Sequence, residues 1–202
     1  MKQLLLMVSL LSLGACSSIS QQECQLGDWF AIGKTDAQQG IAASQFRSYQ
    51  KECARHGHNS DFQAYQQGHA EGAIEFCQYD QGVLWGQQGK SYNSICSGAL
   101  EAEFKLGYQR GRSWYSAKVA LENLQQVFAQ NTETIAELEQ RIDANTDALS
   151  AAQSAQQKQQ LSTENKSLRQ QLGELQRSQG QLQRDLQQAE LNFSLLQKQE
   201  GL

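Results

Sequence analysis

A seven-residue hydrophobic period runs through the second half of the chain. The leucines at this spacing are Leu161, Leu168, Leu175 and Leu182, and the complementary positions include Leu172, Leu186 and Phe193. Such a repeat places apolar side chains along one helix face, where they pack against another helix. The period therefore predicts a coiled coil over residues 117–202, in which Asn165 on the same face fixes the register of two strands.

A second apolar seam lies upstream and does not share this phase. It runs from Leu121 to Leu149, and extending it to residue 163 misses the later seam by two positions. The change falls in SAAQSAQQKQQ at 150–160, which contains neither Gly nor Pro. Because helix breakers are absent there, we expect a single rod about 125 Å long at 1.5 Å per residue. A helical hairpin that bends within 150–160 is the alternative.

The first half repeats a motif in which an aromatic residue precedes glycine by three positions. It occurs in DWFAIG at 28–33, YQQGHAEG at 65–72, YDQGVLWG at 79–86 and FKLGYQRG at 104–111. On a helix these positions lie close together, and each mid-helix glycine costs about 1 kcal/mol relative to alanine. Close approach of neighbouring helices, or an aromatic ring inserted beside the glycine, offsets that cost. We therefore expect four or five short helices, with glycine turns between short strands as the alternative.

Composition changes near residue 116 and divides the chain. All six tyrosines and all three tryptophans precede this point, whereas the remainder is rich in glutamine. We expect a small disulfide-stapled Gly/aromatic helical domain at 28–116, followed by a long coiled-coil helix at 117–202. The predicted fold class is therefore mostly α.

The first sixteen residues resemble the signal of a bacterial lipoprotein. Lys2 precedes an apolar stretch that is shorter than the ~20 residues of a spanning helix, and LGAC at 13–16 resembles a lipobox. The resemblance implies a signal peptide at 1–15, acylation of Cys16 with fatty acids such as palmitate, and a lipid anchor and linker at 16–27. Because serines follow the cysteine, it also implies attachment to the outer membrane, facing the periplasm. An ordinary cleaved signal is the alternative.

Four further cysteines predict two disulfides. They are Cys24, Cys53, Cys77 and Cys96, and an even number in an exported chain indicates pairing because the compartment is oxidising. Three connectivities are open for four cysteines. We favour the sequential pairing, Cys24–Cys53 and Cys77–Cys96, because each bond then closes a short loop. Each bond would stabilise the domain by about 3 kcal/mol.

Four motifs of the first half resemble those of one bacterial family. They are DWFAIGKTDAQQG at 28–40, CARHG at 53–57, DFQAYQQGHAEGAIEFC at 61–77 and GVLWGQQGKSYNSIC at 82–96. Over residues 24–116 the chain resembles the lipoprotein family called domain of unknown function 2799. Ala37 and Ala73 depart from the pattern, where a further Gly and a Leu are expected. The resemblance implies a fold and a compartment; it transfers no catalytic residue, because the family carries no assigned activity.

Residues that could carry chemistry are few. The net charge of −4 comes from scattered residues without a basic patch, so nucleic acid is not an expected partner. His56 and His58 lie near Cys53 in CARHGHNSD, a grouping that could hold zinc, but a paired cysteine and a polar turn explain it better. No Gly-x-Ser-x-Gly elbow indicates a hydrolase. We therefore expect no enzymatic activity, catalytic residue, metal or cofactor.

These features favour a structural or protein-interaction role. We expect a lipid-anchored envelope protein that presents its helical half in the periplasm. This half would either form a coiled-coil homo-oligomer, with a parallel dimer as the leading model, or bind a different helical envelope protein. The alternative is a ligand-binding module. In that case the Gly/aromatic domain would hold a cell-wall fragment or small molecule through residues such as Trp85 or Tyr92.

Overall fold

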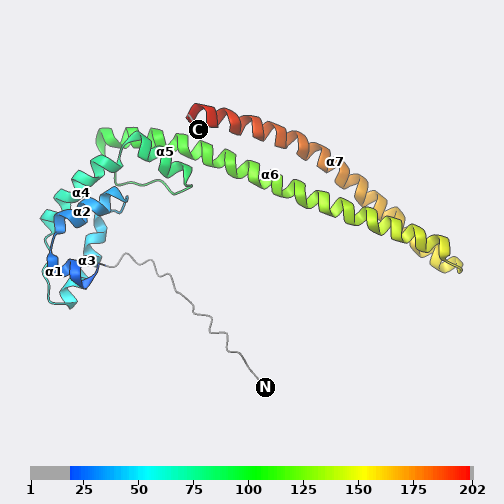
Figure 1. Cartoon of the computed structure of the whole chain (residues 1–202), viewed down its shortest axis with the longest axis horizontal. Coiled ribbons are helices and arrows are strands. Elements are labelled where there is room, and N and C mark those ends of the chain that lie inside the picture. Colours follow the sequence, from blue (N-terminus) through cyan, green and yellow to red (C-terminus); the bar gives the residue numbers. More distant parts are fainter. Residues whose placement is uncertain (1–18, 201–202) are drawn as a thin grey trace, which may run out of the picture. The chain divides into compact units, whose positions relative to one another are not determined.

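The computed structural model describes residues 19–200, in which the fold is helical (Figure 1). The helices are α1 (Gln21–Leu26), α2 (Trp29–Gln38), the 3₁₀ helix η1 (Ala43–Gln45), α3 (Phe46–Arg55), α4 (Phe62–Phe76), α5 (Tyr79–Gln87), α6 (Gly98–Ala151) and α7 (Ala155–Glu200). No strand occurs within 19–200, so the predicted mostly α class is confirmed and the alternative of short strands is wrong. The signal peptide predicted at 1–15 and the acylation predicted at Cys16 lie outside the described residues.

The described residues form two compact units. The first contains 19–78 and 93–103, with α1 to α4, and the second contains 79–92 and 104–200, with α5, most of α6 and α7. The four aromatic–glycine motifs divide equally between the units. Within 19–200, none of the helices has the combination of length and apolar character that crossing a membrane requires.

In the first unit, α2 and α4 pack backbone to backbone at their glycines. A Cβ atom placed on Gly33 would overlap the carbonyl oxygen of Tyr65, and one placed on Gly68 would overlap that of Phe30. Ala37 stands one turn after Gly33, and its Cβ lies 3.0 Å from a Cβ built on the facing residue of α4. Larger side chains at these positions would hold the two helices apart. Glycine is therefore retained despite its helix penalty.

The second unit repeats this arrangement with α5 and α6. A Cβ atom on Gly82 would overlap the carbonyl oxygen of Phe104, and one on Gly107 would overlap that of Tyr79. In each unit, the aromatic residue that precedes one glycine supplies the carbonyl that faces the glycine of the other helix. Such contacts permit Cα–H···O interactions worth roughly 0.5–1 kcal/mol each. The predicted close approach of helices is confirmed, but backbone rather than aromatic rings lies against these glycines.

The aromatic rings of the first unit form its core instead. Trp29 and Phe46 pack edge to face with ring centroids 5.4 Å apart. The Phe46 ring also lies 5.0 Å from that of Tyr65, which is fully buried. These rings join α2, α3 and α4 around one cluster.

Two disulfides staple the helices of the first unit. Cys24–Cys53 ties α1 to α3 within the aromatic core, and Cys77–Cys96 ties the end of α4 to the segment before α6. The sequential pairing favoured from the loop lengths is confirmed.

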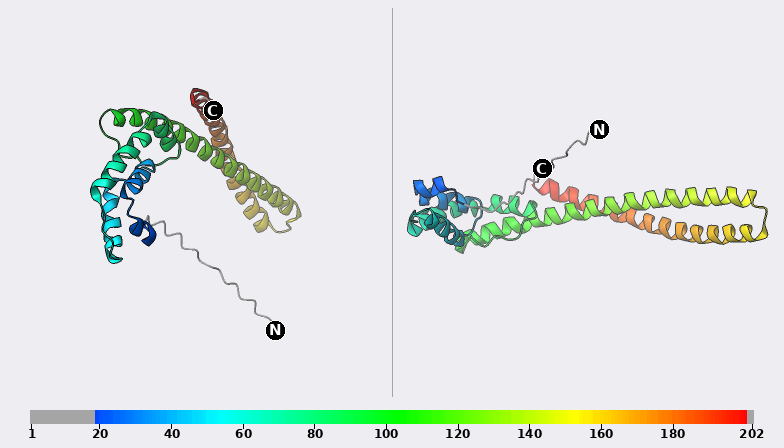
Figure 2. Two further views of the ribbon diagram at one scale, coloured as in Figure 1. Left: turned by 60° about the vertical axis from the view of Figure 1, so that its left-hand side comes forward. Right: turned by 90° about the horizontal axis from the view of Figure 1, so that it is seen from below.

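In the second unit, α6 and α7 lie side by side and antiparallel, as a hairpin (Figure 2). Leu138 and Ile142 of α6 form a buried cluster with Leu168 of α7. Nearer the open end of the hairpin, the rings of Trp114 and Phe193 lie with centroids 5.5 Å apart. The predicted single rod is therefore wrong, and the two apolar seams meet within one chain.

Two physical features explain why the chain turns back. A phase difference of two positions separates the seams by about 200° around a continuous helix, so a straight rod could not present both to one partner. Ser154 also starts a new helix: its Oγ accepts from the Gln157 N–H at 3.2 Å and donates to Oε1 of the same residue at 3.1 Å. The hairpin buries both seams, and its turn needs only residues 152–154.

Replacing Asn165 by leucine is expected to stabilise the hairpin by about 1 kcal/mol. Asn165 is 7 % exposed in the seam, its Nδ2 donates to Thr146 Oγ1 at 3.2 Å, and its Oδ1 has no hydrogen-bond partner among the described residues. Thr146 keeps its own hydrogen bond to the Ile142 carbonyl when the amide is removed. Urea unfolding followed by circular dichroism measures the change. Asn192→Leu, at an exposed site of α7, is the control; equal midpoints for the two variants would contradict the interpretation.

Candidate functional site

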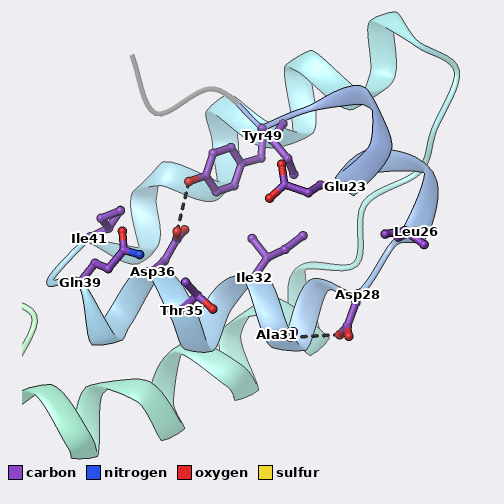
Figure 3. Close-up of a pocket in the computed structure, with 11 residues that line it drawn as sticks. Glu23, Leu26, Asp28, Ala31, Ile32, Thr35, Asp36, Gln39, Ile41 and Tyr49 are labelled. Atoms are coloured by element: carbon purple, nitrogen blue, oxygen red, sulfur yellow. Dashed lines mark hydrogen bonds between the residues drawn. The ribbon is translucent and has the colours of Figure 1, made fainter. Parts of the chain in front are cut away.

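A pocket of about 420 Å³ lies in the first unit, among α1, α2 and α3 (Figure 3). Ile19, Leu26, Ile32 and Ile41 supply its apolar lining. Ile19 is buried, whereas Leu26 is 73 % exposed to solvent. The volume falls within the roughly 300–1,000 Å³ of small-molecule pockets. The pocket is therefore large enough for a ligand of a few to a dozen heavy atoms.

Local signals position the short helices around the pocket. Ser20 and Glu23 form a capping box at the start of α1: the Ser20 N–H donates to the Glu23 carboxylate at 2.8 Å, and Ser20 Oγ accepts from the Glu23 N–H at 3.2 Å. Gly27, with φ of 66°, ends this helix. Asp28 then caps α2 by accepting from the Ala31 N–H at 3.1 Å. Helix starts thus hold two carboxylates of the pocket lining in place.

Asp36 is the buried carboxylate of the pocket. It is 7 % exposed and accepts hydrogen bonds from the hydroxyls of Tyr49 at 3.2 Å and Tyr65 at 2.6 Å. Burial raises the pKa of Asp36 above its usual range, against the opposing effect of the two tyrosine hydrogen bonds. The ring of His69 packs against Tyr65, and its Nε2 donates to the Ile41 carbonyl at 2.8 Å. Polar groups from α2, α3 and α4 therefore converge behind the pocket.

The buried tyrosines predict a loss of stability at high pH. Burial, with the nearby Asp36 charge, raises the pKa of Tyr49 from 10.0 to about 12 and raises that of Tyr65 further. The unfolded chain releases its phenol protons from pH 10 upward while the folded state retains them, so the free energy of unfolding falls by about 1.4 kcal/mol per pH unit per group.

Tyr49→Phe removes one of these contributions. The stability difference between parent and variant should shrink by about 2 kcal/mol between pH 8 and pH 12 in urea unfolding. A difference that stays constant with pH would contradict the interpretation.

The structure places the sequence-derived candidates elsewhere. Trp85 and Tyr92, named for the ligand-binding alternative, belong to the second unit. Cys53 is bonded to Cys24, so it offers no thiolate to a metal beside the nearby histidines. His56 Nε2 instead lies 3.6 Å from the Glu52 carboxylate. Within 19–200, no group of three His, Cys, Asp or Glu side chains is placed to hold a metal ion.

Asp36 and Tyr49 are the site residues that sequence reasoning missed. Asp36 follows Gly33 by three positions and precedes Ala37, so it lies on the buried side of α2. A carboxylate on the packed side of a glycine-bearing helix was the available signal, because charged side chains are rarely buried without a partner. Its tyrosine partners lie 13 and 29 residues away, beyond the reach of any local pattern.

Comparison with known proteins bears on the domain that contains the pocket. Neither curated proteins nor solved structures provide a match to the chain. Among family models, one described as Protein of unknown function (DUF2799) matches residues 28–113. This match supports, over residues 28–113, the resemblance drawn from the aromatic–glycine and cysteine motifs.

Proposed function

We propose that the protein is a non-enzymatic, lipid-anchored envelope protein whose α6–α7 hairpin binds another helical envelope protein in the periplasm. The anchor is supported by LGAC at 13–16, which resembles a lipobox, and the serines that follow Cys16 favour the outer membrane. The length of the hairpin helices also supports the proposal, because it allows contact with a partner at a distance from the anchor: α6 has 54 residues and is about 80 Å long at 1.5 Å per residue.

The exposed apolar face of α7 is the observation that carries this proposal. Leu191 and Leu195 lie one helical turn apart and are 61 % and 57 % exposed. The heptad residue Leu168, which suggested pairing between chains, is already buried inside the hairpin. A partner helix that laid an apolar stripe along Leu191 and Leu195 would remove this surface from water. A second copy of the chain is the competing occupant.

Site-specific photocrosslinking in cells tests the proposal. A photoreactive residue at position 191 or 195 should give one discrete heteromeric product. The matched control is position 185, which is exposed on the same helix but lies about 120° around it from position 191 and about 80° from position 195. Leu191→Ser/Leu195→Ser should abolish the product of a probe at position 188 without loss of helicity, because neither leucine is buried.

The result separates the possible occupants. A product of twice the protein's own mass identifies a second copy and overturns the heteromeric proposal. Equal, diffuse products from positions 185, 191 and 195 would overturn the partner surface altogether. Mass spectrometry of the mature N-terminus tests the anchor separately: an acylated Cys16 is expected, and an unacylated N-terminus would contradict it.

A further inference from the structure

The pocket in the first unit combines an apolar lining with three carboxylates and no basic side chain among the described residues. Glu23, Asp28 and Asp36 all line it, and no lysine or arginine lines it among the described residues. The three carboxylates come from α1, the start of α2 and the interior of α2. A ligand that complements this lining carries positive charge together with an apolar body.

Asp36 indicates where in the pocket the positive charge of the ligand would lie. An ionised carboxylate that is 7 % exposed loses most of its hydration, and its two tyrosine partners are neutral donors. A cation beside Asp36 would stabilise the ionised form, because charges interact more strongly in a partly dehydrated site than in water. Since no three ligating side chains converge on a metal position within 19–200, an organic cation fits better than a metal ion.

We propose that this pocket binds a small primary alkylammonium compound. Its ammonium group hydrogen-bonds Asp36, and its alkyl chain packs against Ile19, Ile32 and Leu26. The ammonium offers three donors, which suit the free lone pairs of a carboxylate that already accepts from Tyr49 and Tyr65. This site is separate from the partner surface of the proposed function, because it lies in the other unit.

The same charges select against related ligands. A phosphoethanolamine headgroup and a free amino acid both carry an anionic group within a few bonds of the ammonium. That anion would enter a lining that already carries three carboxylates and, among the described residues, no lysine or arginine to receive it. The occupant is therefore a free amine and not a zwitterionic lipid.

Ligand-observed NMR on the full mature chain tests the proposal with three six-carbon probes. n-Hexylammonium is the proposed class, hexan-1-ol is the neutral match, and norleucine carries a carboxylate as its sixth carbon, beside the amine. Hexylammonium should bind at least about tenfold more tightly than either of the others, as expected for a charge-assisted hydrogen bond. Equal affinity of hexylammonium and hexan-1-ol would overturn the proposal, and so would equal affinity of norleucine.

Two variants locate the binding. Asp36→Asn keeps the shape and one acceptor for the tyrosines, and it should weaken hexylammonium at least about tenfold while leaving hexan-1-ol unchanged. Asp185→Asn, exposed on α7, is the charge-matched control and should leave both affinities unchanged. Leu26→Ala should weaken both probes, and because Leu26 is 73 % exposed this variant tests the pocket even where Asp36→Asn fails to fold. Equal effects of Asp36→Asn and Asp185→Asn, or unchanged binding in Leu26→Ala, would overturn the assignment.

Discussion

Gly68→Ala is expected to destabilise the first unit by about 3 kcal/mol, although alanine is the better helix former. The new methyl group would overlap the carbonyl oxygen of Phe30 and lie 3.0 Å from the backbone nitrogen of Lys34. Both obstacles are backbone atoms of α2, so relief requires the helices to separate and the reciprocal contact at Gly33 to loosen. The overpacking penalty therefore exceeds the roughly 1 kcal/mol gained in helix propensity.

The chain provides a matched control for this experiment. Gly180 also lies in the middle of a helix, but a Cβ there would meet only the end of the Arg184 side chain, at 4.0 Å. Gly180→Ala should therefore stabilise α7 by up to about 1 kcal/mol. Amide hydrogen exchange, analysed peptide by peptide, should show faster exchange in α2 and α4 for Gly68→Ala and slower exchange in α7 for Gly180→Ala. The packing explanation fails if the two variants change in the same direction.

Loss of the Cys24–Cys53 disulfide from the otherwise unchanged protein is expected to lower the free energy of unfolding by about 3 kcal/mol. The bond closes a loop across a sequence separation of 29 residues. It also holds α1, which has six residues and is too short to persist alone. In Cys24→Ala/Cys53→Ala we therefore expect α1 to lose its exchange protection before α4 does.

Removal of this bond should also abolish binding in the Asp36 pocket, because Ile19 and Glu23 line it from the α1 side. The variant must retain Cys77–Cys96, which intact-mass measurement with and without thiol alkylation establishes. Undiminished protection of α1 would show that the aromatic core holds this helix without the disulfide. In that case the assigned role of the bond is wrong.

The two units use one packing solution twice. In α2–α4 and in α5–α6, each helix has a glycine that admits a backbone carbonyl of the other helix. That carbonyl belongs to the aromatic residue three positions before the other helix's own glycine. Tyr65 and Phe104 hold equivalent places in this arrangement, and both side chains are fully buried. The repeated motif in the sequence thus encodes two separate helix pairs rather than one array.

The sequence alone determined the features that depend on neighbouring residues. The helical class, the aromatic–glycine helices and the sequential disulfides all follow from local periodicity, glycine spacing and loop length, and the structure confirms them. The start of α7 has a sequence signal that the prediction of a rod did not use, because Ser154 and Gln157 have the spacing of a helix start. The rod was predicted from the absence of Gly and Pro in 150–160 alone.

Only the tertiary structure decided which elements meet. The pairing of α2 with α4, the folding of α7 onto α6 and the gathering of Tyr49 and Tyr65 around Asp36 each join residues that are far apart along the chain. A periodic pattern specifies which face of a helix is apolar, but several helices of the chain have such a face and any of them could pack against it. The choice among them depends on the packing and desolvation energy of the whole fold, which no local segment contains.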